Sequence, residues 1–449
     1  MSDVIPDQSV AADRPRRVAL LLQGPPGRFW RALGDALDGE GVRVLKVHFC
    51  LADRLFWGRP GAVDYRGRLR GFRRWLRALI RREGVTDILY YADRMPYHRL
   101  ALKAARSDGI AAHAIEFGYL RPDWLTLERE GGGAYSHFPA DDSALDAEAG
   151  LPDMRPRHKH AFATEAFWEV AFNLAIVAGR PLYPLFYTDR YYAIIPDYVI
   201  WLRKLALGPI ARRRAARAEA ALQASGAPFW LVALQLQSDY QLRDSAPYAH
   251  QTDAIREILR AFAAAAPPDH RLVFKLHPLE NWRERFDRVV AGAAEAEGLA
   301  GRVLTLPEGD LGALIRRSEG VVVINSTVGL HALRAGKPVK PLGAALYAME
   351  GLTDPRPLTA FFAAPRPPDP ATTRALVATL ARETQIRGDF YEPAGREAAA
   401  AEMARRIAEG RVGPSAWRAR AAPPRLAALV AERRRRRAGP LPNRPAPGL

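Results

Sequence analysis

Short apolar runs separated by amphipathic stretches recur along most of the chain. In the first part, four such runs predict β-strands, and the segments between them have apolar residues at helical spacing. Strands that alternate with helices indicate an open parallel sheet with crossover helices. The four runs cover residues 16–22, 41–49, 86–93 and 111–120.

The same alternation returns in the second half of the chain. Strands are predicted over 228–236, 271–278, 301–307, 320–326 and 337–343, with helices over 254–266 and 310–318. We therefore expect an α/β protein with two Rossmann-like halves, the arrangement of GT-B-type glycosyltransferases and of sugar-nucleotide epimerases. Such a pair binds its ligand in the cleft between the halves, at the carboxyl ends of the strands.

These patterns divide the chain into five segments. A disordered N-terminus (1–16) precedes an N-terminal Rossmann-like half (17–139) and a mainly helical connecting region (140–226). The C-terminal Rossmann-like half is expected over 227–413. Residues 414–449 contain seven prolines and the run RRRRR, and we predict a disordered basic tail.

The most apolar stretch, residues 170–201, lies in the connecting region. It contains Arg180, Asp189, Arg190, Asp197 and three prolines. It therefore lacks the roughly 20 consecutive apolar residues that a membrane-spanning helix needs. Its aromatic side chains are typical of a membrane interface and also of buried helices. The first residues lack the apolar core of a signal peptide, so we expect a soluble or peripheral protein.

Composition and charge narrow the possible partners. The 449 residues are 48% hydrophobic, carry a formal net charge of +17 and include one cysteine, Cys50. A single cysteine excludes a disulfide framework and suits a reducing cytoplasm. The charge is concentrated in 54–82, with ten arginines and one acid, and in 414–449, with nine arginines and one acid. We expect an anionic membrane surface or substrate there, or else a solvated arginine-rich face; no nucleic-acid-binding motif accompanies it.

Two of the predicted strands end in carboxylates. Glu116 lies near the end of the strand at 111–120 and is followed by Gly118 and Arg121. It is either a catalytic group or the ion-pair partner of Arg121. Asp239 follows the strand at 228–236. It is either a nucleophile or the cap of the next helix.

The segment around Asp239 contains further polar side chains. Gln237, Asp239 and Gln241 alternate, and in an extended chain they would share one side. The two amides would then flank the carboxylate and hold it in place. Asp244 is close enough in sequence to remain a rival for the same role.

Two other strand ends are suited to phosphate. Lys275 and His277 alternate and would share one side of the strand, which Pro278 ends. A lone histidine, by contrast, is more often a hydrogen-bonded core residue. Asn325, Ser326 and Thr327 join a strand to a helix, where amide N–H groups and hydroxyls either bind an anion or cap the helix.

Taken in chain order, several segments resemble the bacterial capsule polysaccharide biosynthesis family of KpsS/KpsC type. They are GPPGRFWRAL, YYADRMPYHRLAL, EFGYLRPDWLTLE, LQLQSDYQLRDSAPY, KLHP and NSTVGLHALRAGKPV. The resemblance covers about 18–135 and 229–345, and the single module is closer to the KpsS branch. One position departs from the family pattern, Phe117, where the family usually has an acid or a small residue.

The resemblance implies a retaining β-Kdo transferase. Such an enzyme moves 3-deoxy-D-manno-oct-2-ulosonic acid (Kdo) from CMP-Kdo to a (lyso)phosphatidylglycerol-linked acceptor and builds the oligo-Kdo linker of capsular polysaccharide. Carried over by position, Asp239 is the nucleophile, Glu116 the acid/base on the acceptor hydroxyl, and His277 the group that stabilises the leaving phosphate. The implied donor side also includes Lys275, Gln237, Pro278, Asn325, Ser326, Thr327 and His331. The implied acceptor side consists of Gly118, Tyr119, Arg121, Asp93, Arg94, His98, Gly24 and Gly27.

No metal or cofactor is implied beyond CMP-Kdo as the donor substrate. The implied partners are an anionic lipid or glycolipid acceptor, the inner-membrane surface and other capsule assembly proteins, without nucleic acid. The implied location is the cytoplasm, peripheral on the inner face of the inner membrane. Two alternatives stay open: a GT-B-type enzyme acting on another nucleotide sugar, or an epimerase; and a non-catalytic scaffold for capsule assembly or export.

Overall fold

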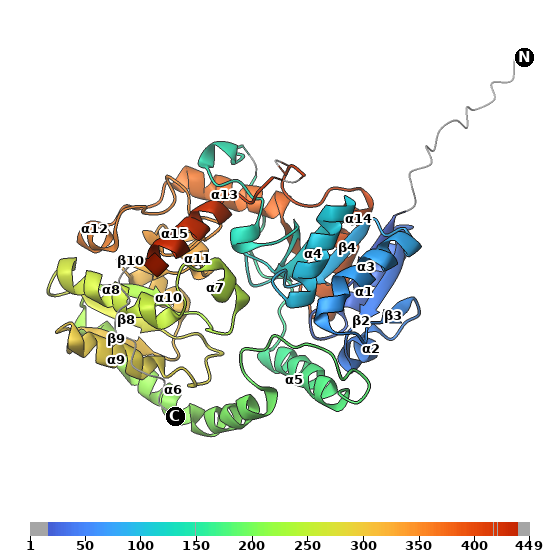
Figure 1. Cartoon of the computed structure of the whole chain (residues 1–449). Coiled ribbons are helices and arrows are strands. Elements are labelled where there is room, and N and C mark those ends of the chain that lie inside the picture. Colours follow the sequence, from blue (N-terminus) through green and yellow to red (C-terminus); the bar gives the residue numbers. More distant parts are fainter. Residues whose placement is uncertain (1–16, 149, 416, 420, 439–449) are drawn as a thin grey trace, which may run out of the picture.

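The N-terminal half is built on a seven-stranded sheet. A computed structural model describes residues 17–148, 150–415, 417–419 and 421–438 (Figure 1). The sheet has the order β12-β6-β5-β4-β1-β2-β3, and its first five strands in chain order pair in parallel. These are β1 (Val18–Leu21), β2 (Arg43–His48), β3 (Ala62–Asp64), β4 (Asp87–Tyr91) and β5 (Ala111–Phe117). The helices of this half are α1 (Phe29–Gly39), α2 (Leu51–Trp57), α3 (Leu69–Glu83) and α4 (Pro96–Asp108).

Side chains of the interior strand β1 alternate between two hydrophobic cores. Val18 and Leu20 pack with Phe72 and Leu76 of α3, whereas Leu21 packs on the opposite face with Leu33 of α1. Both faces of β1 are buried, which explains why its sequence is a continuous apolar run rather than an alternating one.

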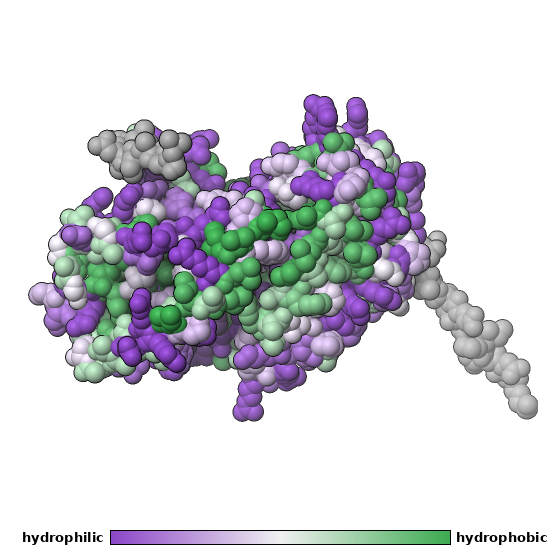
Figure 2. All heavy atoms as spheres, turned by 90° about the horizontal axis from the view of Figure 1, so that it is seen from below, coloured by the Kyte–Doolittle hydropathy of each residue, from purple (hydrophilic) through white to green (hydrophobic). Residues whose placement is uncertain are grey.

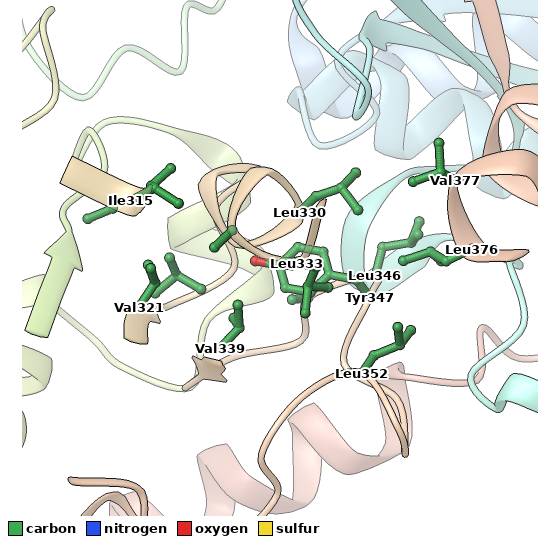
Figure 3. Packing of buried hydrophobic residues seen from close by; sticks show 14 of the residues in the cluster. Ile315, Val321, Leu330, Leu333, Val339, Leu346, Tyr347, Leu352, Leu376 and Val377 are labelled. Atoms are coloured by element: carbon green, nitrogen blue, oxygen red, sulfur yellow. The ribbon is translucent and has the colours of Figure 1, made fainter. Parts of the chain in front are cut away.

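The C-terminal half contains a five-stranded parallel sheet of order β11-β10-β7-β8-β9. Its strands are β7 (Phe229–Ala233), β8 (Arg271–Lys275), β9 (Val303–Leu306), β10 (Gly320–Val323) and β11 (Val339–Pro341). Its helices are α7 (Tyr240–Ser245), α8 (Gln251–Ala265), α9 (Phe286–Ala296), α10 (Leu311–Arg317), α11 (Val328–Arg334), α12 (Leu358–Ala363) and α13 (Pro370–Glu383). Figure 3 shows the core on the α11 side of this sheet, where Leu330 and Leu333 lie beside Leu346 and Tyr347.

The predicted α/β fold with two Rossmann-like halves is confirmed, and each of the nine predicted strands is present. Three further strands were not predicted: β3, β6 (Trp124–Arg129) and β12 (Gln385–Arg387). β3 and β12 have three residues each, too few to show a periodic pattern. β6 follows β5 after a loop without a helix and pairs antiparallel with it, which the βαβ pattern does not anticipate.

Two long helices dominate the segment between the halves. After the short 3₁₀ turns η1 (Gly133–Tyr135) and η2 (Asp142–Ala144) come α5 (Phe162–Ala178) and α6 (Ile194–Ser225). They run along the lower edge of the molecule in Figure 1, with α5 beneath the N-terminal half and α6 beneath the C-terminal half. In the described residues, no helix is both long and apolar enough to cross a membrane.

The chain returns to the N-terminal half before its end. β12 pairs antiparallel with β6, and α14 (Pro393–Ala408) packs against α1. Residues 227–413, expected as one C-terminal half, therefore contribute to both halves. The return is not visible in the sequence because its single strand has three residues and its helix pattern does not indicate which sheet it covers.

The expected disorder of 414–449 is wrong for much of that segment. α15 (Leu426–Ala438) packs against the body of the protein, with Leu429 buried, and the Arg425 side chain before it is also buried. Arginines that suggested a solvated tail instead bind backbone carbonyl groups of the folded protein. The expected disorder of 1–16 lies outside the described residues, as does that of 439–449.

Candidate active site

A cleft between the two halves is bounded by the carboxyl ends of the central strands. It encloses about 570 Å³ and is formed largely by residues at or just beyond the ends of β4 and β5 of one half and of β7, β8 and β10 of the other. This is the position that two facing Rossmann-like halves predict for a ligand. Of the side chains singled out in the sequence, Glu116, Tyr119, Arg121, Asp239, Gln241, His277, Asn325, Ser326 and Thr327 line it.

Asp239 stands at the start of α7 and faces the cleft. Its carboxylate accepts a hydrogen bond from the Gln241 N–H at 2.8 Å, so it caps the helix, and it remains exposed in the cleft. Desolvation by the cleft walls raises the pKa of Asp239, while the Gln241 N–H and the Arg121 guanidinium oppose that rise. The helix-capping role is present, and it leaves the carboxylate available to a ligand.

The extended arrangement expected around Asp239 is wrong. β7 ends at Ala233, so the alternation of a strand does not reach this segment. The buried Gln237 side chain accepts a hydrogen bond from the Gln251 N–H at 3.0 Å, which ties it to the start of α8 instead of the cleft. The Gln241 side chain turns toward the opposite wall of the cleft.

Glu116, at the end of β5, forms that opposite wall. Gln241 Nε2 donates a hydrogen bond to it at 3.4 Å from across the cleft. Burial raises the pKa of Glu116 to about 8, and two neighbouring carboxylates add to the rise. Among the described residues, Glu116 forms no ion pair with Arg121, so that alternative is wrong. The Arg121 guanidinium instead lies over the Phe117 ring, 4.8 Å from its centroid. Glu116 is therefore held mostly protonated at neutral pH.

The turn between β5 and β6 is held by a residue from the far end of the chain. Gln385 of β12 accepts a hydrogen bond from the Tyr119 N–H at 2.8 Å and donates one to Thr126 Oγ1 at 3.0 Å. The Tyr119 hydroxyl donates to Glu128 at 2.9 Å and accepts from the Gly133 N–H at 2.9 Å. The returning C-terminal segment thus fixes one wall of the cleft.

His277 contributes a neutral hydrogen-bond donor. Its Nδ1 accepts a hydrogen bond from the Leu279 N–H at 3.1 Å, which places the ring proton on Nε2. Burial lowers the pKa of His277 to about 4, and the positive charges of Arg121 and Lys275 act in the same direction. At neutral pH the ring is uncharged and able to donate from Nε2.

Lys275 does not share a face with His277, which corrects that expectation. β8 ends at Lys275, so the alternation of the strand stops before the histidine. The buried Lys275 ammonium donates to the carbonyl oxygens of Leu276 at 2.9 Å and Pro307 at 3.3 Å. Pro278 lines a neighbouring pocket of about 260 Å³ that also reaches His277.

Asn325 lines the cleft, but its side-chain amide is hydrogen-bonded to other residues of the protein. It accepts from Gln235 Nε2 at 2.8 Å and donates to the Gln241 carbonyl oxygen at 2.7 Å. These bonds connect the ends of β7 and β10 to α7. Asn325 therefore positions the segment that carries Asp239.

Ser326 and Thr327 lie at the entrance to α11. Ser326 Oγ accepts from the Val328 N–H at 3.2 Å, and the Ser326 carbonyl oxygen accepts from the buried Tyr347 hydroxyl. Both residues border the cleft. His331, one turn further along α11, is not in the cleft lining, and burial lowers its pKa to about 4.

The other implied acceptor-side side chains lie behind the cleft wall. Burial raises the pKa of Asp93 to about 7, and the positive charge of the adjacent Arg94 opposes that rise. Arg94 Nε donates to Asp244 at 3.4 Å. Asp244, the alternative nucleophile, is therefore bound to Arg94 outside the cleft. His98 is fully buried, with Nδ1 2.9 Å from the Ala92 carbonyl oxygen.

The three implied acceptor-side glycines have structural roles: two allow close packing and one has a positive φ. A Cβ at Gly24 would come within 2.6 Å of the Trp30 ring, and one at Gly118 within 2.4 Å of the Trp124 carbonyl oxygen. Gly27 has a φ of +118°, which side chains rarely adopt. None of the three is in the cleft lining.

Sequence reasoning missed the contribution of the connecting region. Glu169 of α5 and the segment from Asp189 to Tyr192 line the cleft. The Tyr240 hydroxyl donates to the Asp189 carboxylate at 3.1 Å, and burial raises the pKa of Glu169 to about 7. The only signal in the sequence was the aromatic, charge-interrupted run at 187–192, whose position against the C-terminal half depends on the tertiary fold.

Comparison with known proteins gives matches over most of the chain. The family model described as capsule polysaccharide biosynthesis protein matches residues 86–391. The capsule polysaccharide export protein KpsS of Escherichia coli is 29% identical over 379 residues, which cover 83% of this chain and 96% of KpsS. The capsule polysaccharide modification protein LipB of Neisseria meningitidis serogroup B is 31% identical over 394 residues, 83% of this chain and 91% of LipB. Among solved structures, the β-Kdo 2,7 transferase of Thermosulfurimonas dismutans KpsC is 15% identical, with a TM-score of 0.41 over 88% of this chain and 99% of that one.

Proposed function

The chain belongs to the capsule polysaccharide biosynthesis family, and we propose that it is a retaining glycosyltransferase that transfers Kdo from CMP-Kdo. The observation that supports this most directly is the pair of carboxyl groups on opposite walls of the cleft, Asp239 and Glu116. Their environments differ: Asp239 is exposed, and the Gln241 N–H and the Arg121 guanidinium oppose the rise of its pKa, whereas burial and two neighbouring carboxylates raise the pKa of Glu116 to about 8. Carboxyl pairs of this kind divide the roles of nucleophile and proton carrier.

In the first step, the Asp239 carboxylate attacks the anomeric carbon of Kdo. A bond forms between that carbon and a carboxylate oxygen, and the bond from the carbon to the CMP phosphate breaks. The phosphate leaves as an anion and needs hydrogen-bond donors or cations rather than an acid. His277 Nε2–H and the Arg121 guanidinium line the same cleft and are suited to that task.

In the second step, the acceptor hydroxyl attacks the same carbon from the face that CMP has left. Glu116 takes the hydroxyl proton as the new glycosidic bond forms, and Asp239 is released as a carboxylate. Two inversions at one carbon give net retention. A base with a pKa of about 8 is well matched to this proton at neutral pH.

We further propose that the acceptor is a (lyso)phosphatidylglycerol-linked lipid and that the protein works on the inner face of the inner membrane. The names of its relatives place those proteins in capsule polysaccharide export and modification. The exposed apolar side chains of α5 and α6 lie next to the segment that borders the cleft, which suits an acceptor with an apolar anchor.

The proposal is tested by intact-protein mass spectrometry after incubation with CMP-Kdo alone. Wild type and Asp244→Asn should each gain the mass of one Kdo, and Asp239→Asn should gain none. Asn caps a helix as well as Asp does, so this variant keeps α7 in place. Asp244→Asn is the matched control, because its carboxylate pairs with Arg94 and does not line the cleft.

Two outcomes would contradict the proposal. An adduct that persists in Asp239→Asn would overturn the assigned nucleophile. Absence of an adduct, together with no CMP release when a lipid acceptor is supplied, would instead favour a different nucleotide sugar or a non-catalytic role in capsule assembly.

A further inference from the structure

One face of the protein is unusually apolar for a surface in contact with water. Of the 18 large hydrophobic side chains that are exposed in the described residues, 15 lie between residues 162 and 210. Figure 2 looks at the molecule from below and shows a continuous hydrophobic band with hydrophilic margins, on the side where Figure 1 places α5 and α6. We call this band the α5–α6 face. Its members are Phe162, Phe167, Val170, Leu174, Val177, Leu182, Leu185, Tyr187, Tyr191, Ile195, Val199, Leu202, Leu205, Leu207 and Ile210.

The protein core does not account for these apolar residues. α6 has 32 residues, of which Gly208, Ala215 and Leu222 are its buried ones; α5 has 17, with Phe172, Asn173 and Ile176 buried. Most apolar side chains of both helices therefore point outward. Exposed apolar surface of this extent marks a site of interaction.

The margin of the face is positively charged. Residues 198–218 contain six Arg and Lys side chains and no Asp or Glu. In the described residues, none of the five arginines is in an ion pair; they are Arg203, Arg212, Arg213, Arg214 and Arg217. An apolar face with cationic flanks and aromatic side chains is the composition of helices that lie in the plane of an anionic membrane surface.

The same helices are unsuited to crossing a bilayer. None of the helices described for this chain has a sufficiently long apolar stretch, and α6 contains Pro209 within its length. A helix with this composition lies at the interface, with its apolar side toward the acyl chains.

We infer that the α5–α6 face docks the protein onto a bilayer containing anionic phospholipid. A second copy of the chain fits the face poorly, because a two-fold contact would bring the arginines of α6 against one another. A bilayer with anionic headgroups satisfies both the apolar band and its cationic margin at once.

Docking in this way brings the cleft to the membrane. Tyr191 belongs to the face and also lines the cleft. Phe162 and Leu205 of the face line the neighbouring pocket, which reaches His277. A lipid-linked acceptor could therefore present its headgroup to the cleft while its acyl chains stay in the bilayer. This last point rests on the proposed function, whereas docking itself does not.

The test is co-sedimentation with vesicles of phosphatidylcholine alone or with 30% phosphatidylglycerol (on the order of a cytoplasmic-leaflet anionic content). Wild type should bind the anionic vesicles and bind the neutral ones at least about tenfold more weakly. The double variant Val199→Glu/Leu202→Glu should lose binding to anionic vesicles by at least about tenfold. These side chains are 63% and 67% exposed, so thermal unfolding should not change.

A matched control uses exposed apolar residues outside the face. Leu151→Glu/Val430→Glu adds the same charge at positions 54% and 38% exposed, and it should bind vesicles like wild type. Arg213→Gln/Arg217→Gln tests the charged margin and should weaken binding to anionic vesicles severalfold without changing binding to neutral ones.

Three results would overturn the inference. Vesicle binding by Val199→Glu/Leu202→Glu equal to wild type would show that the face is not the docking surface, and an equal loss in the control would show that added charge alone prevents binding. A dimer seen by light scattering that this double variant dissociates would assign the face to a second copy. The assay contains no sugar donor, so a failure of docking is distinct from a failure of transfer.

Discussion

Glu116 and His277 face the same cleft, and burial shifts their titrations in opposite senses. Burial disfavours the charged form of each group, so it raises the pKa of the carboxyl group to about 8 and lowers that of the imidazole to about 4. Near pH 7, Glu116 is therefore mostly protonated and the His277 ring is neutral. Among the described residues, the arginines in the cleft lining, Arg121 and Arg190, form no ion pair and supply its positive charge.

The reaction rate should depend on pH through Glu116. As a base, it acts only when ionised, and its raised pKa keeps that fraction small below pH 8. We expect kcat/KM for the acceptor to rise by about tenfold for each pH unit below the pKa and to level off above pH 8. Glu116→Gln should lower the rate by roughly 10²–10⁴-fold and abolish the rise. Initial rates between pH 6 and 9 give the measurement.

Thermal unfolding of the same variant supplies a control that is independent of activity. A carboxyl group whose pKa is higher in the folded protein than in the unfolded chain favours folding while it is protonated. That contribution is present below about pH 4 and is lost as the pH rises through about 8. The difference in Tm between Glu116→Gln and wild type should therefore shift in favour of the variant as the pH rises from 5 to 8.5. An unchanged difference across this range would contradict the raised pKa.

The turn from β5 to β6 determines the shape of one cleft wall. The Gly118 N–H donates to the Trp124 carbonyl oxygen at 2.7 Å, and the two chains approach too closely for a side chain at Gly118. Gln385 of β12 then fixes Tyr119 in the same turn. Two strands adjacent in sequence and one from the far end of the chain cooperate to place Glu116 and Arg121.

Gly118→Ala should disturb this turn. Its Cβ would meet backbone atoms of Trp124, which cannot move aside as a flexible side chain can. We expect a loss of roughly 1–3 kcal/mol in the free energy of unfolding. The matched control is Gly292→Ala in α9, where the space is open and alanine should stabilise the helix by roughly 0.5–1 kcal/mol. Urea unfolding measures both, and equal effects of the two substitutions would contradict the account.

The segment from Arg425 through α15 joins the two halves of the protein. The buried Arg425 guanidinium donates to the carbonyl oxygens of Phe138 at 2.7 Å, Leu346 at 2.6 Å, and Pro139. Arg433 of α15 donates to the Ala246 carbonyl oxygen at 2.8 Å. Burial lowers the pKa of Arg425 to about 10, which leaves it charged at neutral pH. One side chain thus connects the end of the N-terminal half to the loop after β11.

Removal of Arg425 should destabilise the protein as a whole. Arg425→Ala leaves two buried carbonyl oxygens and one partly buried one without their donor, and we expect a loss of roughly 3 kcal/mol in the free energy of unfolding. Arg437→Ala, at an exposed position of α15, should change it by less than about 0.5 kcal/mol. Urea unfolding followed by tryptophan fluorescence compares them. Equal stability of the two variants would show that the segment is dispensable.

The α/β class, the two Rossmann-like halves and the strand ends that carry Glu116, Asp239 and His277 could be predicted from the sequence alone. These follow from local rules: buried parallel strands are continuous apolar runs, and their carboxyl ends face one cleft. The family was also accessible, because its motifs are short, ordered and local. The assigned roles of these residues remain predictions.

Which of the neighbouring polar side chains reach the cleft depends on the three-dimensional fold and could not be predicted. Lys275, Gln237 and Asp244 have the right chemistry and sequence position, yet each is engaged by backbone or by Arg94 elsewhere. Strand alternation fails there because strands end a few residues before their polar extensions. Contacts between distant segments also determine three further features, which a local pattern cannot specify. They are the pairing of β12 with β6, the hydrogen bonds of Arg425 and the outward apolar face of α5 and α6.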